Sequence, residues 1–426
     1  MTFSALSILA LAIFISAYVL VMLEEVIHLK KSKPVVVAAG LIWLVIGLAH
    51  PGAHDLEEAA SHLLAEYGAL FLFLLVAITY VNTLEERRVF DALRVKLVQS
   101  GLSYRGLYWL IGVLSFLLSG VLDNLTTTLV MGAIALVVGK GAPRFLAVTC
   151  VSIVVAANAG GAFSPFGDIT TLMVWQKGKV AFFEFFDLFV PSVINWLVPA
   201  VLMGLAMERG APSAKVDAVR MKPGSIGVMV LFAISIALAI SFHSVLGLPP
   251  ALGMMLGLGL LQLWAYYLQR AAKRSGNGDM VLDAFRQIER VEWDTLLFFF
   301  GIIFAVGGLG YLGWLGLANT TLYGQFGPTT ANIVIGLLSA VLDNIPLMYA
   351  VLAMDPAMSH GQWLLITLTC GVGGSLLAVG SAAGVALMAI AGEHYGVIKH
   401  LKWSWAILLG YAASIGTHLM LNASLF

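Results

Sequence analysis

Charged residues are scarce in this sequence. Only 11% of its 426 residues are Asp, Glu, Lys or Arg, and 60% are hydrophobic, whereas soluble domains carry about 25% charged residues. The mean hydropathy is +0.95. Since a helix needs about 20 apolar residues to cross a bilayer, the apolar runs allow about ten spans. The composition excludes an ordinary soluble domain and predicts an all-α polytopic membrane protein whose partner is the lipid bilayer.

The chain also lacks net charge and has few cysteines. Its 23 Lys and Arg balance its 23 Asp and Glu, so no basic surface for nucleic acid is predicted. The two cysteines, Cys150 and Cys370, lie in apolar segments, where cysteine is usually a small core residue. Their number and context exclude a disulfide framework. We therefore expect no cofactor and no nucleic-acid partner.

Two similar apolar stretches carry the sharpest signal in the sequence. Each contains Leu-Asp-Asn, with Asp123-Asn124 in the first and Asp343-Asn344 in the second, and no Lys or Arg lies nearby in sequence. A carboxylate within the membrane is costly and by default indicates function. Two copies of one motif predict an internal duplication, with a site between the halves.

Irregular segments accompany both motifs. Glycines interrupt the apolar runs at 158–168 and 371–381, with a proline in the first, and such residues do not sustain a helix interior. Irregular backbone survives at membrane depth only inside protein or along a wet cavity. The first predicted inverted repeat is 1–208, with a re-entrant hairpin at 106–138 and a broken helix at 145–175. The second is 225–426, with a hairpin at 328–354 and a broken helix at 363–390. A cytoplasmic linker is predicted at 209–224 between them. A single kinked span is the alternative for 106–138.

The basic residues predict the orientation. We place both termini outside and count ten spans and two hairpins. In this layout 21 of the 23 Lys and Arg lie in the cytoplasm, and only Lys177 and Lys179 lie outside. Such a bias is typical of cytoplasmic loops. The first hairpin then enters from inside and the second from outside. The repeats are therefore inverted, which is an arrangement of secondary transporters.

Three carboxylates lie at membrane depth in this layout, those of Asp123, Asp168 and Asp343, with no basic residue at the same depth. Burial disfavours the charged form of a carboxyl, and a bound cation favours it. A proton and a metal cation therefore compete for such a group, which is sufficient for exchange. We expect Asp123 and Asp343 to be the primary exchangers. Asp168 has a second interpretation, as the cap of the helix that follows it.

Neutral oxygen donors surround these acids in the sequence. Hard cations such as Na⁺ prefer oxygen ligands, and no His/Cys cluster indicates a transition metal. Na⁺ is expected at Asp123, Asn124, Asp343 and Asn344. The residues expected to bind the cation or support the site are Asn124, Thr126, Thr127, Asn158, Ser164, Asp168, Thr170, Thr171, Ser339, Asn344, Ser375 and Ser381. The alternative is that the Ser, Thr and Asn side chains only satisfy backbone groups at the helix breaks.

These motifs resemble the ion transporter superfamily that includes dicarboxylate/sodium symporters and arsenite and citrate permeases. The strings Asp-Asn-Leu-Thr-Thr-Thr at 123–128 and Ser-Pro-Phe-Gly-Asp-Ile-Thr-Thr at 164–171 are most similar to NhaD-type sodium/proton antiporters. The second Asp-Asn motif departs from the family pattern, because Ile345-Pro346 follows its Asp-Asn pair without the threonine. The second break has Ser-Ala-Ala-Gly at 381–384, where the symporters have Pro-Pro-Asn. Both departures favour a carboxylate-based cation site over an anion site.

The resemblance implies an elevator-like or rocking homodimer in a bacterial inner membrane that exports Na⁺ or Li⁺ in exchange for H⁺. The first rival is an anion transporter of the same superfamily, for arsenite or a carboxylate. It would need a basic group or an extra helix N-terminus at depth, and no Lys or Arg is expected there. The second rival is an intramembrane di-aspartyl protease, which the broken helices and the duplication disfavour. We therefore expect a transporter and not an enzyme.

Overall fold

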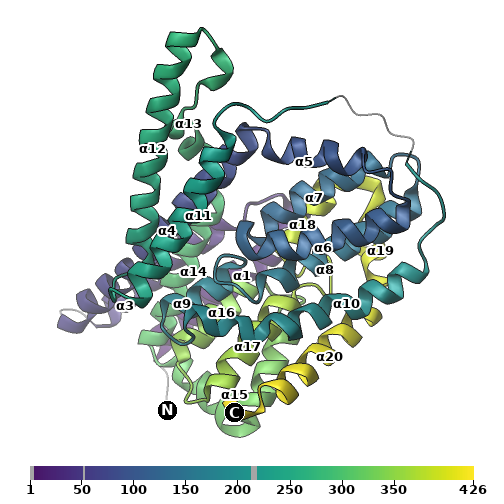
Figure 1. Ribbon diagram of the computed structural model, residues 1–426. Coiled ribbons are helices and arrows are strands. Elements are labelled where there is room, and N and C mark those ends of the chain that lie inside the picture. The colour runs from purple at the N-terminus through teal and green to yellow at the C-terminus, as the bar shows by residue number, and fades with distance from the viewer. Residues whose placement is uncertain (1–3, 51–52, 213–217) are drawn as a thin grey trace.

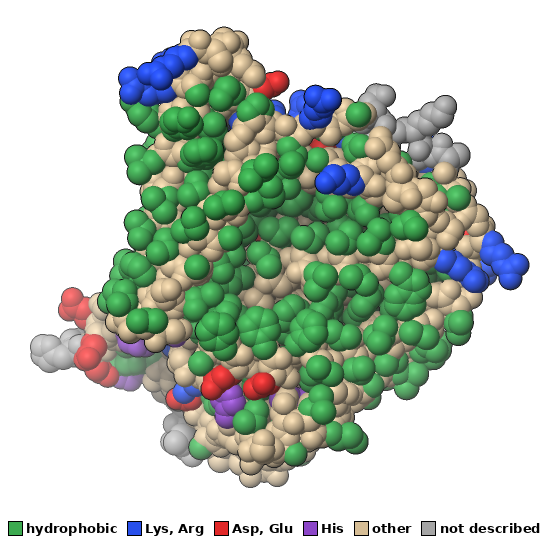
Figure 2. Space-filling model, viewed as in Figure 1, with side chains coloured by type: hydrophobic (Ala, Val, Ile, Leu, Met, Phe, Trp, Pro, Cys, Tyr) green, Lys and Arg blue, Asp and Glu red, His purple; other side chains and the backbone are tan. Residues whose placement is uncertain are grey.

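The computed structural model describes residues 4–50, 53–212 and 218–426. Within these residues the secondary structure is helical, without strands, and ten helices are long and apolar enough to span a membrane. Both termini lie at the same, lower edge in Figure 1. Figure 2 shows a broad hydrophobic band, with most of the Lys and Arg on this face along its upper and right edges and most of the Asp and Glu toward its lower edge. The chain is an all-α polytopic membrane protein.

One group of helices, called here the frame, packs around α3, α4, α12 and α14. Glycines allow close contact within it; a Cβ at Gly301 of α14 would lie 2.7 Å from the Val35 backbone of α3. The frame comprises α1 (Ala5–Met22), α2 (Glu24–Ile27), α3 (Ser32–Ala49), α4 (His54–Glu86), α11 (Ser225–Ser244), α12 (Pro250–Ser275), η2 (Gly278–Met280), α13 (Ala284–Glu289) and α14 (Trp293–Tyr311).

The other helices form the core group, which packs around α8 and α17. Helix α5 (Val89–Val98) contacts both groups, through α4 and α7. The core group comprises α6 (Tyr104–Leu122), α7 (Asn124–Val138), α8 (Pro143–Gly161), α9 (Ile169–Gln176), η1 (Phe182–Leu188), α10 (Phe189–Leu205), α15 (Trp314–Leu338), α16 (Asn344–Met354), α17 (His360–Gly373), α18 (Ala382–Ala391), η3 (Gly392–His394), α19 (Val397–Leu401), α20 (Ser404–Leu421) and η4 (Ala423–Leu425).

A pair of helices lies at each predicted hairpin. Helices α6 and α7 contact each other and both contact α8 (Figure 1), as the arms of a hairpin at 106–138 would. In the second hairpin α15 is broken at Gly327, whose φ of 73° and ψ of 160° are not helical. Residues 328–338 and α16 therefore form its two arms. The number of long apolar helices matches the expected ten spans, but the set differs, because it includes α6 and omits the short halves of 363–390.

The two broken helices pack on the hairpins through equivalent glycines. A Cβ at Gly160 of α8 would lie 2.0 Å from the Phe116 carbonyl oxygen, and a Cβ at Gly373 of α17 would lie 1.9 Å from the Gly336 carbonyl oxygen. Phe116 and Gly336 each precede the hairpin-tip aspartate by seven residues (123 − 116 and 343 − 336). Any side chain at these two glycines would collide with backbone. The same construction is therefore used twice, far apart in the sequence.

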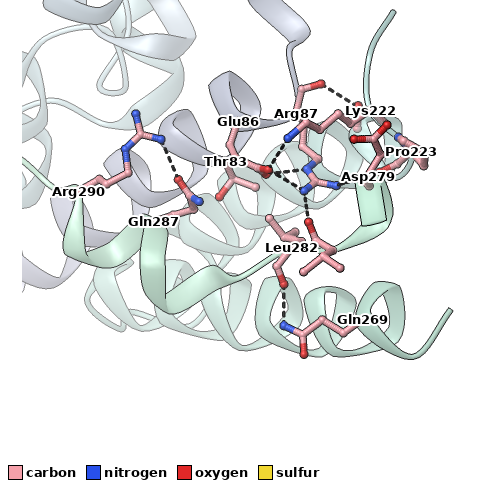
Figure 3. Close-up of polar contacts among 12 residues, drawn as sticks. Thr83, Glu86, Arg87, Lys222, Pro223, Gln269, Asp279, Leu282, Gln287 and Arg290 are labelled. Atoms are coloured by element: carbon pink, nitrogen blue, oxygen red, sulfur yellow. Dashed lines mark hydrogen bonds and ion pairs between the residues drawn. The ribbon is translucent and has the colours of Figure 1, made fainter. Parts of the chain in front are cut away.

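A buried arginine at the end of α4 joins three segments of the chain (Figure 3). The Arg87 guanidinium binds both carboxylate oxygens of Glu86, at 2.7 and 2.8 Å, and donates to the carbonyl oxygens of Pro223, Asp279 and Val281. Pro223 belongs to the predicted linker at 209–224, of which 213–217 lie outside the described residues. The side chain is fully buried with its charge compensated, so it ties α4 to the linker and to the segment before α13.

Candidate functional site

Asp168 lies where the two hairpin tips meet. Its Oδ2 accepts hydrogen bonds from the side-chain amides of Asn124, at 3.3 Å, and Asn344, at 3.1 Å. These asparagines follow the two tip aspartates and are 220 residues apart (344 − 124). The other oxygen, Oδ1, accepts from the Thr170 backbone N–H at 3.1 Å and caps α9. The capping interpretation of Asp168 is therefore confirmed for Oδ1, while Oδ2 receives the amides of both tips.

Asn158 links the same centre to the second broken helix. Its Oδ1 accepts from the Asn124 amide at 3.0 Å. Its Nδ2 donates to the hydroxyl oxygens of Ser375, at 2.8 Å, and Ser381, at 3.0 Å. Ser381 caps α18 as Asp168 caps α9, each eight residues after its close-packed glycine (381 − 373 and 168 − 160). Of the residues singled out from the sequence, six form one network: Asn124, Asn158, Asp168, Asn344, Ser375 and Ser381.

Asp123 sits beside this network in an unusual backbone conformation. Its φ of 70° and ψ of 159° fall in a region that is almost restricted to glycine and costs about 1–3 kcal/mol. Its carboxylate accepts from the Thr126 backbone N–H at 2.7 Å and from the Thr126 hydroxyl at 2.8 Å. Within the described residues, neither Asp123 nor Asp168 forms an ion pair with Lys, Arg or His.

Asp343 differs, and here the expectation that no basic residue lies at depth is wrong. Lys31 Nζ lies 2.9 Å from Asp343 Oδ2, and the two side chains are 17% and 15% exposed. Lys31 precedes α3, which begins beside the first turns of α14: the Ser32 hydroxyl donates to Asp294, and Lys31 Nζ lies 4.5 Å from the centroid of the Phe298 ring. The turn that contains Lys31, predicted to be cytoplasmic, therefore contacts a carboxylate inside the protein. The two paired residues are 312 positions apart in the sequence.

The remaining predicted residues lie nearby but outside the network. The Thr171 hydroxyl donates to the carbonyl oxygens of Ser164 and Asp168, at 2.8 and 2.6 Å. The Ser164 hydroxyl accepts from the Phe166 N–H. The Ser339 hydroxyl donates to the Gly336 and Cys370 carbonyl oxygens. These three side chains satisfy backbone groups at the breaks, as the alternative interpretation states. The hydroxyls of Thr127 and Thr170 are buried and have no hydrogen-bond partner among the residues that the structure describes.

A cavity of about 120 Å³ lies between the frame and the hairpin tips. It reaches from the site to Asn82, in the last turns of α4, and to Glu292, which immediately precedes α14. These residues lie on the side of the Arg87 cluster, which the basic residues predict to be cytoplasmic. The polar and charged residues that line the cavity are Lys31, Asn82, Asp123, Asn124, Thr126, Asp168, Glu292, Thr295 and Asn344.

On the opposite side of the site, a polar contact joins the frame to the core group. Glu66 of α4 forms an ion pair with Lys177, which follows α9. The Tyr349 hydroxyl of α16 donates to the same carboxylate at 3.3 Å. A separate cavity of about 100 Å³ adjoins these side chains. The contact lies at the predicted outer side, where Lys177 is one of two expected basic residues.

Sequence reasoning missed Lys31, Asn82, Glu292 and His400 as site residues. The first three lie at the charged ends of apolar segments, which normally face solvent, and His400 lies in α19, outside the long apolar helices. The His400 ring is buried; its Nε2 lies 2.7 Å from the Ser375 carbonyl oxygen and its Nδ1 2.7 Å from the Tyr395 hydroxyl. Burial lowers the pKa of His400 to about 4. The neutral ring donates through Nε2 and positions Ser375, whose hydroxyl binds Asn158.

Comparisons with known proteins identify the family of this chain. The model of the citrate transporter family matches residues 18–371. The Na⁺/H⁺ antiporter NhaD of Alkalimonas amylolytica is 53% identical, in an alignment that covers 100% of this chain and 93% of that protein. The NhaD antiporter of Halomonas elongata is 51% identical, covering 100% and 90%. The crystal structure of the Alcanivorax borkumensis YdaH transporter has a TM-score of 0.55 at 14% identity, covering 93% and 99%, and so shares the fold. The chain therefore belongs to the citrate transporter family and, within it, to the NhaD-type antiporters.

Proposed function

We propose that this chain is a secondary-active Na⁺(Li⁺)/H⁺ antiporter in which a proton and a cation bind alternately to carboxylates at the hairpin tips. One observation carries the proposal: the amides of both tips converge on Asp168 beside Asp123, and neither carboxylate has a basic partner among the described residues. A buried anion without a counter-charge needs a proton or a metal cation. The full-length relatives named as Na⁺/H⁺ antiporters support this assignment.

The ligands of the proposed site are oxygen atoms. Carboxylate, amide and hydroxyl oxygens come from Asp123, Asn124, Thr126, Asp168 and Asn344, and small hard cations prefer such donors. Across the described residues, no three His, Cys, Asp or Glu side chains come close enough together to hold a metal ion. The cation would therefore be held by few charges and several neutral oxygens. Weak, multi-donor binding suits a cargo that must be released on the other side.

The proposal includes an alternation between two sides. The site cavity extends toward Asn82 and Glu292, and the Glu66–Lys177 pair closes the other side. We assign this arrangement to a state that faces the cytoplasm. Movement of the core group against the frame, with the repeats 1–208 and 225–426 inverted about the site, would open the other side. We further propose that the protein is a homodimer in a bacterial inner membrane, that its basic loops lie in the cytoplasm, and that it has no enzymatic activity.

An anion transporter remains the second candidate, because the family model that matches is that of citrate transporters. Lys31 supplies a positive charge at the site, which an anion would need. Asp343 neutralises it, however, with its Oδ2 at 2.9 Å from Nζ. The site then keeps two unpaired carboxylates, which repel an anion. The geometry therefore favours a cation.

A transport assay tests the proposal directly. In everted membrane vesicles that contain the protein, addition of Na⁺ or Li⁺ should dissipate an imposed pH gradient. Asp168→Asn should abolish this response, because the amide cannot bind a proton and a cation in turn. Citrate and arsenite serve as comparison substrates. Coupled movement of either anion, without a response to Na⁺ or Li⁺, would assign the chain to the second candidate.

A further inference from the structure

We propose that Lys31 is an internal counter-cation for Asp343, so that Lys31 and a transported cation compete for the same carboxylate. This inference rests on the proposed antiport function and adds a positioning residue to it. In the arrangement described here the second hairpin tip is held against the frame by Lys31. Binding of a cation at Asp343 then requires the tip and the Lys31 ammonium to separate.

Both carboxylate oxygens of Asp343 already have a partner. Oδ2 binds Lys31 Nζ at 2.9 Å, and Oδ1 accepts from the Ile345 backbone N–H at 3.2 Å. A metal cation at Oδ2 would have to replace the ammonium, since two cations at one oxygen repel each other. Asp123 and Asp168 have no such occupant among the described residues. The three carboxylates are therefore not equivalent, although their sequence contexts are similar.

The lysine is held where it can act on the tip. It stands in the turn between α2 and α3, where its backbone N–H donates to Glu24 Oε1 at 3.3 Å. Its ammonium lies over the Phe298 ring, and Asp294 binds the next residue through the Ser32 hydroxyl. Glu24 and Asp294 are the other carboxylates that act on Lys31. All these contacts belong to the frame, whereas Asp343 belongs to the core group.

The tip connects this pair to the centre of the site. Asp343 binds Lys31, and the adjacent Asn344 donates to Asp168 at 3.1 Å. Separation of Asp343 from the frame would therefore move an amide that binds the central carboxylate. Through two neighbouring residues, cation occupancy at the tip is coupled to the contact between the frame and the core group.

The test measures Na⁺ binding without requiring transport. The melting temperature of the purified protein is recorded against NaCl, with choline chloride holding ionic strength constant, and the Na⁺ concentration that gives half of the shift is determined. Lys31→Met removes the competing cation and should lower this concentration at least threefold. Lys31→Arg should restore the wild-type value. Lys33→Met, two residues along and exposed, is the matched control and should not change it.

A double variant separates competition from a general structural effect. In the Asp343→Asn background the carboxylate that both cations need is gone, so adding Lys31→Met should change the half-saturating Na⁺ concentration no further. An additive effect, or an unchanged or raised value in Lys31→Met alone, would overturn the inference. If the wild type exchanges Na⁺ for H⁺ in vesicles but the variants do not give the expected Na⁺ concentrations, only the inference about Lys31 is wrong. If the wild type neither exchanges nor responds to Na⁺, the proposed function itself fails.

A measurement on the wild type covers the case in which Lys31→Met does not fold. Acetylation of lysines by an amine-reactive ester is followed by mass spectrometry in Na⁺ and in choline. Displacement by Na⁺ should raise the modification of Lys31 relative to Lys33. Equal modification of Lys31 in the two media contradicts competition.

Discussion

Asp168 caps a helix with one carboxylate oxygen and, in the proposed function, exchanges a proton for a cation at the other. Its Oδ1 caps α9 through the Thr170 N–H, while its Oδ2 faces the amides of Asn124 and Asn344. A neutral asparagine at this position could still cap the helix. It could not carry the alternating charge that exchange requires. Substitution by asparagine therefore separates the two roles at Asp168.

Asp123→Asn should likewise abolish cation-induced proton release in everted vesicles, with a rate at least tenfold below wild type. The substituted amide can still accept from the Thr126 N–H through its oxygen, and its NH₂ group can donate to the Thr126 hydroxyl oxygen in place of accepting from it, so the hairpin tip should keep its conformation. Melting temperature in detergent checks that the protein is folded. Exchange at the wild-type rate in a folded Asp123→Asn protein would remove this residue from the mechanism.

The lowered pKa of His400 predicts that the stability of the protein depends on pH. Its pKa in the folded protein, about 4, lies below the ordinary value of 6.5, so the unfolded chain binds the proton more readily. The contribution of the neutral ring is intact above about pH 6.5 and is lost as the pH falls toward 4, by at most about 3 kcal/mol. His400→Gln can still donate to the Ser375 carbonyl but does not titrate. The fall in melting temperature between pH 6.5 and 4.5 should therefore be smaller in this variant. His394→Gln is the matched control, and an equal fall in all three proteins would contradict the assignment.

At the scale of elements, the hairpins and broken helices depend on backbone contact. Gly160 and Gly373 pack against carbonyl oxygens of the hairpin arms, and the chain between each glycine and the next helix cap carries the site residues. This packing aligns Asp168 with both tips and Ser381 with Asn158. Close contact at the glycines therefore determines the positions of residues that do not touch them.

Gly160→Ala tests this dependence. The added Cβ would lie 2.0 Å from the Phe116 carbonyl oxygen, so the helices must separate, and overpacking of this kind costs about 1–3 kcal/mol. We expect a lower melting temperature and a loss of Na⁺-dependent stabilisation. Gly259→Ala is the control, because a Cβ there has no neighbour within 4 Å. Similar stability of the Gly160→Ala protein and this control would show that the contact tolerates a side chain.

At the scale of the whole molecule, the contact between the frame and the core group differs on its two sides. The site cavity lies on the side of the basic cluster around Arg87, and the Glu66–Lys177 pair lies on the opposite side. Exchange requires that this difference be reversible. The outer ion pair must therefore break in each cycle if the proposed alternation is correct.

A cross-link between the two groups should stop the cycle. In the double variant Glu66→Cys/Lys177→Cys, a short bifunctional thiol reagent would join α4 to the end of α9 and block exchange. The control pair is Lys179→Cys/Asp355→Cys, which replaces an ion pair within the core group, and its cross-link should leave exchange intact. Undiminished exchange after complete linkage at 66 and 177 would exclude movement between the groups at this contact.

The sequence by itself determined the membrane class, both hairpin tips, both helix breaks and most members of the polar network. These features are local, because a low charge content, an Asp-Asn pair in an apolar run and a glycine-rich interruption are visible within about 20 residues. Only the tertiary structure decided which carboxylate lies at the centre and which one has a basic partner. Asp168 meets amides from two tips, and Asp343 meets a lysine 312 residues away, contacts that no local pattern encodes. The physical reason is that the charge balance of a buried group depends on its neighbours in space, and here the two halves of the chain supply them.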